Sequence, residues 1–310
     1  MREKKYASAN KAKASFDDVY VMPTPHAYIA TMAKHGFEIG EQARPYCLEA
    51  VNLLNECNGS VWPVQMLDVG CSYGVGAAFV KYRCSFNELV TFFASRAPKE
   101  YKKACEVTRR WLRVGALDRN VRCVGLDVSG PAVRFALDAG LLDGGIVRNF
   151  DEPGVKPTNE EISWFRSCNL LISTGVIGYV TDRALDIILE HLGKEHPAEM
   201  GPFAVITILR MFDPSAIQNV FEKHGLLLKN VAGIRLPQRR FADERERAEI
   251  LTVLHKRGLD TRGWEDKGTM FADLFVAAPS KQLPLLLNRM KTTRLEREPA
   301  QAAFAMSGEA

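Results

Sequence analysis

Residues 64–76 read VQMLDVGCSYGVG, and this stretch decides the fold. A short apolar run, 64–69, ends in a glycine-rich turn and is followed by the apolar residues 77–80. The run predicts a buried strand, and the residues after the turn predict the start of a helix. Strand, glycine turn and helix in this order are typical of a nucleotide site in an α/β protein.

The same alternation continues along the chain. Residues 122–127 predict a second buried strand, and Pro131 and Gly140 are placed to begin and end a helix over residues 132–139. Further strands are predicted over 145–150, 170–174, 203–209, 226–234 and 270–278. The alternation of strands and helices indicates a parallel sheet covered on both faces, and the last two strands, separated by a charged helix, indicate an antiparallel edge.

The remaining segments are decorations of this α/β domain. We expect a flexible basic tail over 1–15, a helical cap over 16–62, the α/β domain over 63–279 with a helical insertion at 82–120, and a C-terminal tail over 280–310. The insertion is expected to pack over the ligand-binding edge of the sheet. The apolar run 283–287 in the last segment could pack on a second copy of the chain, which would make a homodimer.

Composition excludes several classes of protein. The chain has 46% hydrophobic and 25% charged residues, which is ordinary for a globular protein. A formal net charge of +4, from 41 basic and 37 acidic residues, gives little reason to expect a nucleic-acid partner. No run is long and apolar enough for a membrane span or a secretory signal. Seven scattered cysteines, with no metal-ligand spacing to the six histidines, favour a reduced cytoplasm and no metal site.

The chemistry should lie just after each parallel strand, because ligands bind beyond the carboxyl ends of such strands. Gly70, Gly74 and Gly76 would let the backbone pass close to a ligand. Their spacing, G-x-x-x-G-x-G, differs from the dinucleotide fingerprint, which argues against NAD or FAD. Asp127, at the end of the second strand, could accept hydrogen bonds from both hydroxyls of a ribose, or it is a solvated acid at a strand end.

Two later loops offer further candidates. Asn149, Phe150 and Asp151 follow the third strand, where an adenine ring could lie, although a plain polar loop fits equally well. Thr174 follows the fourth strand with Tyr179 close behind; this tyrosine could orient an acceptor, face a cation with its ring, or belong to the core. Arg235, Arg239 and Arg240 could pair with a substrate carboxylate, but acids just downstream favour surface ion pairs; Arg239 is the weak candidate among them.

Residues 66–76, 124–127 and 171–175 resemble the first, second and fourth motifs of class I S-adenosylmethionine (SAM)-dependent methyltransferases. The resemblance implies a doubly wound, Rossmann-like and mostly parallel seven-stranded sheet with an antiparallel edge strand, and SAM as cofactor. In that family the first acid and the glycine turn face the methionine part of SAM, the second acid holds the ribose, and the loop after the third strand faces adenine. The cofactor-binding set carried over is Asp68, Gly70, Cys71, Ser72, Gly74, Gly76, Asp127, Val128, Phe150, Asp151, Thr174 and Gly175.

Three functions stay open at this point. The first is methyl transfer to a small acceptor, in which positioning supplies much of the acceleration. Residues 174–181 and 238–243, together with the long insertion, also resemble a bacterial secondary-metabolism subgroup of methyltransferases, some members of which are similar to azetidine-2-carboxylate synthases. The second function, implied by this resemblance, is closure of SAM into a four-membered ring with release of methylthioadenosine. There Tyr179, Thr174, Asn149 or Ser173 could take or share a proton. The third is a SAM-binding protein without turnover.

Overall fold

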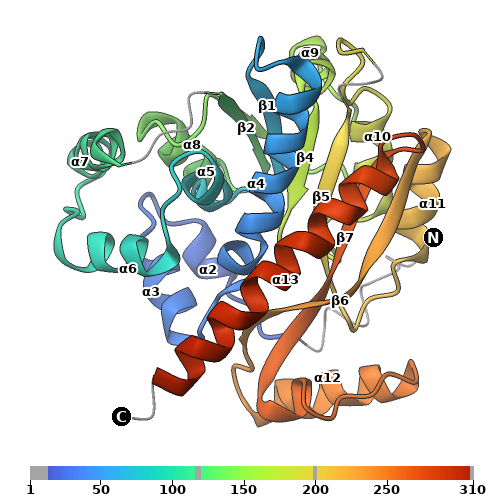
Figure 1. Ribbon diagram of the computed structural model, residues 1–310. Helices are drawn as coiled ribbons and strands as arrows, with labels where there is room; N and C mark the ends of the chain where they lie inside the picture. Colours follow the sequence, from blue (N-terminus) through green and yellow to red (C-terminus); the bar gives the residue numbers. More distant parts are fainter. Residues whose placement is uncertain (1–12, 116–119, 198–200, 308–310) are drawn as a thin grey trace.

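One seven-stranded sheet forms the centre of the computed structural model, which describes residues 13–115, 120–197 and 201–307 (Figure 1). The strands are β1 (Val64–Val69), β2 (Val121–Asp127), β3 (Gly144–Val147), β4 (Leu170–Ser173), β5 (Phe203–Leu209), β6 (Leu226–Arg240) and β7 (Thr269–Pro279). Their order is β3-β2-β1-β4-β5-β7-β6, and β7 runs antiparallel to both of its neighbours while β1 to β5 are parallel. The predicted α/β fold, mostly parallel with antiparallel pairing at one edge, is confirmed.

The central strands are apolar without alternation because helices cover both of their faces. All seven residues of β5 and all four of β4 are buried. A parallel strand buried on both sides gains apolar contacts from every side chain, so period-two patterning disappears. This burial is why continuous apolar runs in the sequence located the strands well.

Helices enclose the sheet. They are α2 (Asp17–Tyr20), α3 (His26–Lys34), α4 (Ile39–Asn58), α5 (Val75–Val80), α6 (Phe86–Ser95), α7 (Tyr101–Val114), α8 (Gly130–Asp138), α9 (Asn159–Ser167), α10 (Asp182–Leu189), α11 (Ser215–Lys223), α12 (Glu244–Lys256) and α13 (Leu283–Ser307), with a 3₁₀ turn at Glu265–Lys267. α4 packs on β1, β4 and β5 and also against α5. Crossovers between parallel strands are right-handed. From β1 to β3 the chain moves one way across the sheet, which places α5 and α8 on the same face as α4. After β3 it moves the other way, so α9 to α11 cover the opposite face.

The segment 280–310, expected as a tail, is instead a packed helix over most of its length. Leu283, Leu286 and Met290 of α13 are buried, and the helix lies along α4 and β7 (Figure 1). Arg289 adds ion pairs to Glu49 and Glu56 of α4. Leu283 and Leu286 of the apolar run that suggested contact with a second copy therefore pack within their own chain, while Leu285 is 47% exposed. Of the expected basic tail 1–15, residues 1–12 lie outside the described part.

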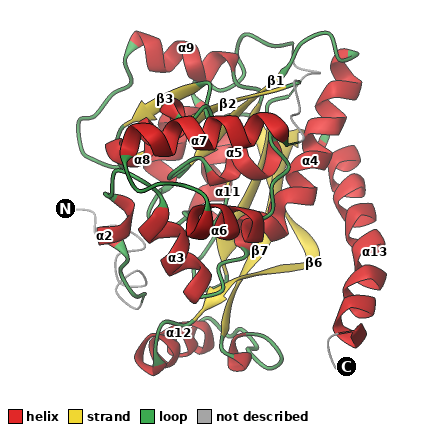
Figure 2. Ribbon diagram, turned by 90° about the vertical axis from the view of Figure 1, so that its left-hand side faces the viewer, coloured by secondary structure: helices red, strands yellow, loops and turns green. Residues whose placement is uncertain are grey.

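The far ends of β6 and β7 extend past the ends of the parallel strands, and α12 lies beside them (Figures 1 and 2), with Ile250 and Leu254 buried in the common core. β6 has register shifts between Asn230 and Arg235 and between Pro237 and Arg239. Such irregularities bend a strand and re-aim its side chains. The end of β6 thereby reaches the edge of the sheet where the parallel strands end.

The surface gives no sign of a membrane-spanning element in the described residues. No helix there is both long and apolar enough to cross a bilayer.

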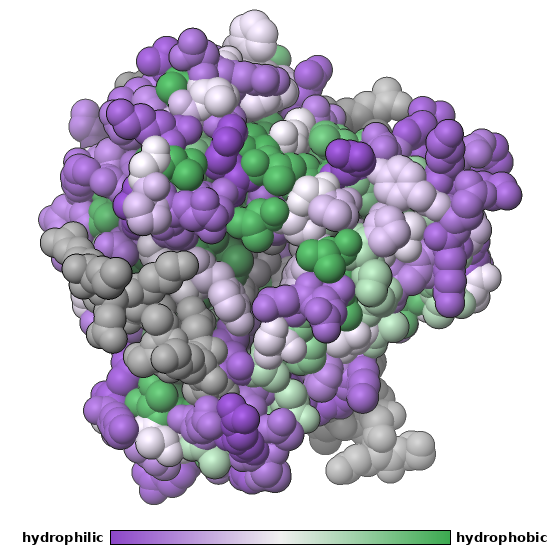
Figure 3. Space-filling model, turned by 180° about the vertical axis from the view of Figure 1, so that it is seen from behind, coloured by the Kyte–Doolittle hydropathy of each residue, from purple (hydrophilic) through white to green (hydrophobic). Residues whose placement is uncertain are grey.

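Seen from behind, apolar residues reach the surface in the middle of a face whose border is mostly hydrophilic (Figure 3).

Candidate active site

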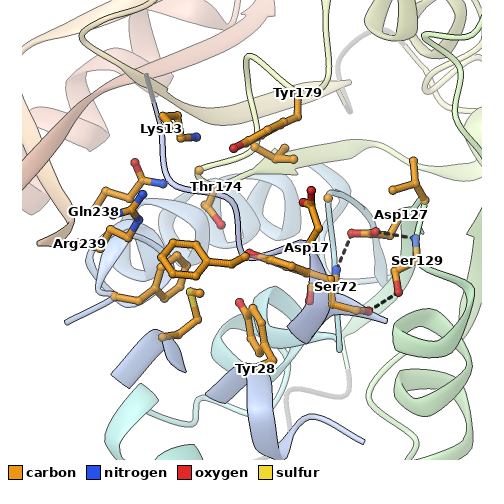
Figure 4. Close-up of a pocket in the computed structure, with 18 of the residues that line it drawn as sticks. Lys13, Asp17, Tyr28, Ser72, Asp127, Ser129, Thr174, Tyr179, Gln238 and Arg239 are labelled. Atoms are coloured by element: carbon orange, nitrogen blue, oxygen red, sulfur yellow. Dashed lines mark hydrogen bonds between the residues drawn. The ribbon is translucent and has the colours of Figure 1, made fainter. Parts of the chain in front are cut away.

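A cavity of about 390 Å³ lies beyond the carboxyl ends of β1, β2 and β4. Small-molecule sites usually have volumes of about 300–1,000 Å³. β1 and β4 are adjacent in the sheet, and the chain runs outward from them in opposite directions. The cavity therefore lies at the switch point where sheets of this kind bind ligands. Its walls are the N-terminal segment, α3 with the residues that follow it, the loops after β1, β2 and β4, and the end of β6 (Figure 4).

Asp127, the last residue of β2, is held in this cavity by two backbone N–H groups. Ser72 N–H donates to one carboxylate oxygen and Ser129 N–H to the other, each over 2.9 Å. Burial raises the pKa of Asp127, and the two bonds oppose that rise because they favour the charged form. Each oxygen has a further lone pair. The carboxylate can therefore accept hydrogen bonds from a diol while the backbone keeps it in place.

Asp68 lines a second, smaller cavity of about 30 Å³ that adjoins the first. Burial, and to a lesser extent the charge of Asp127, raises the pKa of Asp68 to about 7. Its Oδ2 atom is buried and has no hydrogen-bond partner in the described part of the chain. A buried polar atom without a partner is costly, so this oxygen favours a donor or a cation in the small cavity.

The three glycines of the turn have different roles. A β-carbon at Gly76 would lie 2.3 Å from Asp68 Oδ2, and one at Gly70 would lie 2.7 Å from the side chain of Val176. Gly74 lines neither cavity; it begins α5 with φ +78°, and a β-carbon there would meet Leu141 at 2.9 Å. The expectation that all three make room for a ligand is wrong for Gly74, because its side-chain direction faces the packing of α8 and the residues after it.

The segment 13–22 contributes six residues to the lining of the large cavity and is fixed at both ends. Ala14 N–H donates to Glu246 Oε1 over 2.8 Å, and the hydroxyl of Tyr73, in the glycine turn, donates to Met22 O over 2.7 Å. Ser129 Oγ also donates to the carbonyl of Tyr20. Because Tyr73 and Ser129 belong to the two loops that shape the Asp127 site, this segment covers the site and shields it from water.

The loop after β4 and the end of β6 form the opposite side of the cavity (Figure 4). Thr174 lines both cavities, and Tyr179 lines the large one with half of its surface exposed. Burial raises the pKa of Tyr179, so its phenol keeps its proton and acts as a donor. Gln238 is 5% exposed and lines the large cavity, and its Oε1 atom has no hydrogen-bond partner in the described residues.

Arg239 forms an ion pair, as its sequence neighbours indicated, but the pair is buried and not on the surface. Its Nη1 donates to Glu246 Oε2 over 2.9 Å and its Nη2 to Oε1 over 2.6 Å. Glu246 also accepts the N–H of Ala242, and the Arg239 and Glu246 side chains are 5% and 2% exposed. The guanidinium charge is thus neutralised within the protein, which leaves Arg239 poorly suited to pair with a substrate carboxylate.

Lys13 reaches the same side of the cavity from the N-terminal segment. Its Nζ atom lies 4.2 Å from the centre of the Tyr179 ring. Burial, reinforced by the charge of Arg239 and opposed by that of Glu246, lowers the pKa of Lys13 to about 7. No carboxylate in the described part of the chain forms an ion pair with it. The segment expected as a flexible tail therefore places a cation in the site.

Three predicted site residues lie outside both cavities. Asn149 bonds to Glu152 and to its own loop. Phe150 is a core residue packed on Phe165, and Asp151 accepts hydrogen bonds from Thr181 at the start of α10. None of the three lines either cavity, and the adenine contact and catalytic role expected of them stay predictions.

The insertion is also placed differently from the prediction. α6 packs against α3 of the cap, and α7 packs against α8 of the α/β domain. No described residue of 82–120 lines the large cavity. The cap is the element that covers the ligand-binding edge, and the insertion supports the cap.

Most of the other predicted residues do meet at the site. The large cavity is lined by Gly70, Ser72, Asp127, Val128, Thr174, Gly175 and Tyr179, and the small one by Asp68, Cys71 and Gly76. Sequence reasoning missed the site role of Lys13, Tyr20, Tyr28 and Gln238. No local signal marked Lys13, while the two tyrosines lie in a helical pattern that indicates core. Gln238 lies near the end of the long edge strand β6, whose bend the sequence does not reveal.

The chain was compared with known proteins of three kinds: family models, curated proteins and solved structures. No family model matches the chain, and no curated protein matches it. Solved structures do resemble it. One is the plantazolicin methyltransferase BamL in complex with a triazolic desmethylPZN analog and S-adenosylhomocysteine (SAH), with 9% identity, 89% of this chain and 97% of that chain covered, and a TM-score of 0.42.

Two others are a TehB-like SAM-dependent methyltransferase from Corynebacterium glutamicum and the [4+2]-cyclase SpnF. The first has 14% identity over 73% of this chain and 86% of that one, and the second 15% over 74% and 79%; both have TM-scores of 0.33. At these scores the assignment of the fold rests on the strand order described above.

Proposed function

We propose that this protein binds SAM in the two joined cavities and transfers its methyl group to a small acceptor. The observation that carries the proposal is the Asp127 carboxylate, fixed by Ser72 and Ser129 N–H groups at the switch point of the sheet and facing the large cavity. A carboxylate at the end of β2, the neighbour of the strand that leads into the glycine turn, can accept hydrogen bonds from the two hydroxyls of a ribose.

The other residues of the site fit the remaining parts of SAM. The unpaired Oδ2 of Asp68 suits the ammonium group of the methionine part, and Gly70 and Gly76 keep that space open. Val128 lines the large cavity beside Asp127 and is 66% exposed, so it offers an apolar surface to the adenine ring. These three contacts orient the ligand with its sulfur toward Thr174 and Tyr179.

SAM supplies an electrophilic methyl group, so the protein's main tasks are to hold an acceptor in line and to exclude water. No histidine lines either cavity in the described residues. The Tyr179 phenol can donate a hydrogen bond to the acceptor, and the segment 13–22 covers the site. An acceptor whose nucleophilic atom is already unprotonated suits such a site best.

Two measurements test the proposal. Calorimetry with SAH should give a 1:1 complex, and incubation with SAM and a panel of small amines, carboxylates and phenols should yield SAH together with a methylated compound identified by mass. If SAH fails to bind, the proposed function is wrong. If SAH and SAM bind but no product forms over a long incubation with any acceptor, the non-catalytic SAM-binding alternative is the correct one.

The second candidate is ring closure of SAM itself, favoured by the cover over the cavity and by the unpaired Gln238 amide next to Gly175. The α-amine of SAM would attack its own γ-carbon and the carbon–sulfur bond would break, leaving azetidine-2-carboxylate and methylthioadenosine, with one proton released. Incubation with SAM alone separates the two reactions. Methylthioadenosine without any acceptor supports ring closure, whereas SAH that appears only with an acceptor supports methyl transfer.

A further inference from the structure

The side of the cavity opposite Asp127 holds two polar groups that the described protein leaves without partners. Lys13 places its ammonium over the ring of Tyr179, and no described carboxylate pairs with it. Gln238 turns a buried amide toward the same cavity, and its Oε1 accepts no hydrogen bond. Figure 4 shows Lys13, Tyr179, Thr174 and Gln238 grouped on this side. A cation and a hydrogen-bond acceptor on the same side of the cavity favour a ligand that carries an anion and a hydrogen-bond donor.

The neighbouring charges cancel and therefore do not supply that complement. Arg239 and Glu246 form a two-bond ion pair, and Glu246 accepts the N–H of Ala14 as well. Tyr179 keeps its proton, since burial raises its pKa. The Arg239–Glu246 pair therefore leaves the Lys13 ammonium over the Tyr179 ring without a counter-charge among the described residues, and Asp17, which also lines the cavity, forms no ion pair with it. A carboxylate placed against it would form a charge-assisted hydrogen bond shielded from water.

We propose that Lys13 and Gln238 form a subsite for an amino-acid-type group, in which Lys13 binds the carboxylate and Gln238 Oε1 accepts the neighbouring N–H. The proposal rests on the proposed function in one respect, because the subsite lies in the cavity that would also hold SAM. The carboxylate belongs either to the methyl acceptor or to the methionine part of SAM folded toward Lys13. The first source fits methyl transfer, and the second fits ring closure.

The subsite should depend on pH in a defined direction. Lys13 faces Arg239 of β6, Glu246 of α12 and the Tyr179 ring, and Asp17 of its own segment also lines the cavity. Only the ammonium form binds a carboxylate, so affinity is highest below the Lys13 pKa of about 7 and falls as the pH rises through it. Arginine at this position stays charged at all these pH values and removes the dependence.

The experiment compares two kinds of ligand pair in wild type, Lys13→Met and Lys13→Arg. The first kind is a carboxylate and its carboxamide: glycine with glycinamide, alanine with alaninamide, and benzoate with benzamide, titrated into the SAH complex and into the free protein. The second kind is SAH with methylthioadenosine, which lacks the amino-acid end. Lys102→Met on the exposed face of α7 controls for the loss of one surface charge.

An acceptor carboxylate at the subsite gives at least tenfold tighter binding of a carboxylate than of its carboxamide. SAM's own carboxylate there gives an at least tenfold loss of SAH affinity in Lys13→Met, with methylthioadenosine unaffected. In both cases Lys13→Arg keeps the preference and Lys102→Met leaves it unchanged, whereas Gln238→Leu weakens the binding of the probes that carry an amine and not that of benzoate. The proposal is overturned if Lys13→Met alters neither preference, or if no probe shows one. If neither SAH nor methylthioadenosine binds wild type, the proposed function is contradicted. Titration of the carboxylate and carboxamide probes into the free protein then still tests whether Lys13 binds a carboxylate.

Discussion

The backbone N–H of Ser72 donates to the carboxylate of Asp127 over 2.9 Å and so ties the turn after β1 to the end of β2. Ser72 has φ +48°, a left-handed conformation that is uncommon for a residue with a side chain. The bond offsets part of that strain, and it aims the acid into the cavity. Local strain of this sort is characteristic of functional sites.

Replacing Asp127 with asparagine should weaken SAH binding without unfolding the protein. The amide can accept from only one of the two N–H groups, and its NH₂ would face the other. We expect the dissociation constant for SAH to rise by about 10- to 100-fold, the effect of losing charge-assisted hydrogen bonds. Calorimetry measures the affinity, and thermal unfolding checks the fold. Asp266→Asn, an exposed acid far from both cavities, is the matched control, and equal affinities for the two variants would contradict the assignment.

Replacing Gly76 with alanine should distort the small cavity. The new β-carbon would lie 2.3 Å from Asp68 Oδ2, so the carboxylate or the start of α5 must shift. We expect a loss of stability of about 1–3 kcal/mol, typical of overpacking, together with weaker SAH binding. Gly130→Ala also alters a glycine in the first turn of a helix, but its β-carbon meets nothing closer than 3.7 Å. Urea unfolding of both variants checks the difference, and equal losses would rule out a steric role for Gly76.

Replacing Asp68 with asparagine should stabilise the free protein at pH 8. Burial, with the nearby charge of Asp127, raises the Asp68 pKa to about 7, so the unfolded chain loses this proton first as the pH rises, and stability falls between pH 4 and 7. Removing that cost should add roughly 1–4 kcal/mol at pH 8 and much less near pH 4. SAH binding should be lost in the same variant, and wild-type affinity should increase from pH 6 to pH 8. If Asp68→Asn is less stable than wild type at pH 8, burial of the ionised Asp68 carboxylate does not destabilise the protein.

Replacing Glu246 with glutamine should destabilise the end of β6. It leaves Arg239 buried without its counter-charge, which costs about 3–5 kcal/mol in comparable cases. Burial raises the pKa of Glu246, but the bonds from Arg239 and from the Ala242 and Ala14 N–H groups outweigh it, and the net shift is downward. The stability contributed by ionised Glu246 is therefore present above its unfolded pKa and is lost as the pH falls through the lower folded value.

Acid titration of stability should show this loss in wild type and not in the Glu246→Gln variant. Glu249→Gln is the control, because its ion pair with Arg245 is largely exposed and should contribute less than about 1 kcal/mol. If the two variants lose the same stability, the buried pair does not hold the end of β6 in place.

The sequence by itself determined the sheet and the part of the site that is formed by the ends of β1 and β2 and by the glycine turn. Continuous apolar runs locate strands that are buried on both faces, and glycines and acids at strand ends are local features that survive without knowledge of packing. Asp68, Gly70 and Asp127 were therefore found where the structure has them, beside the two cavities.

Only the tertiary structure decided the rest of the site, because its residues come from distant parts of the chain. Lys13 reaches the cavity through a segment fixed by Glu246, more than two hundred residues away, and Gln238 arrives on a strand bent by register shifts. Asn149 has suitable chemistry, but its side chain bonds to Glu152 in its own loop and lines neither cavity. Neither side-chain direction nor long-range hydrogen bonding is encoded in local pattern, and these two physical factors set which polar groups face the ligand.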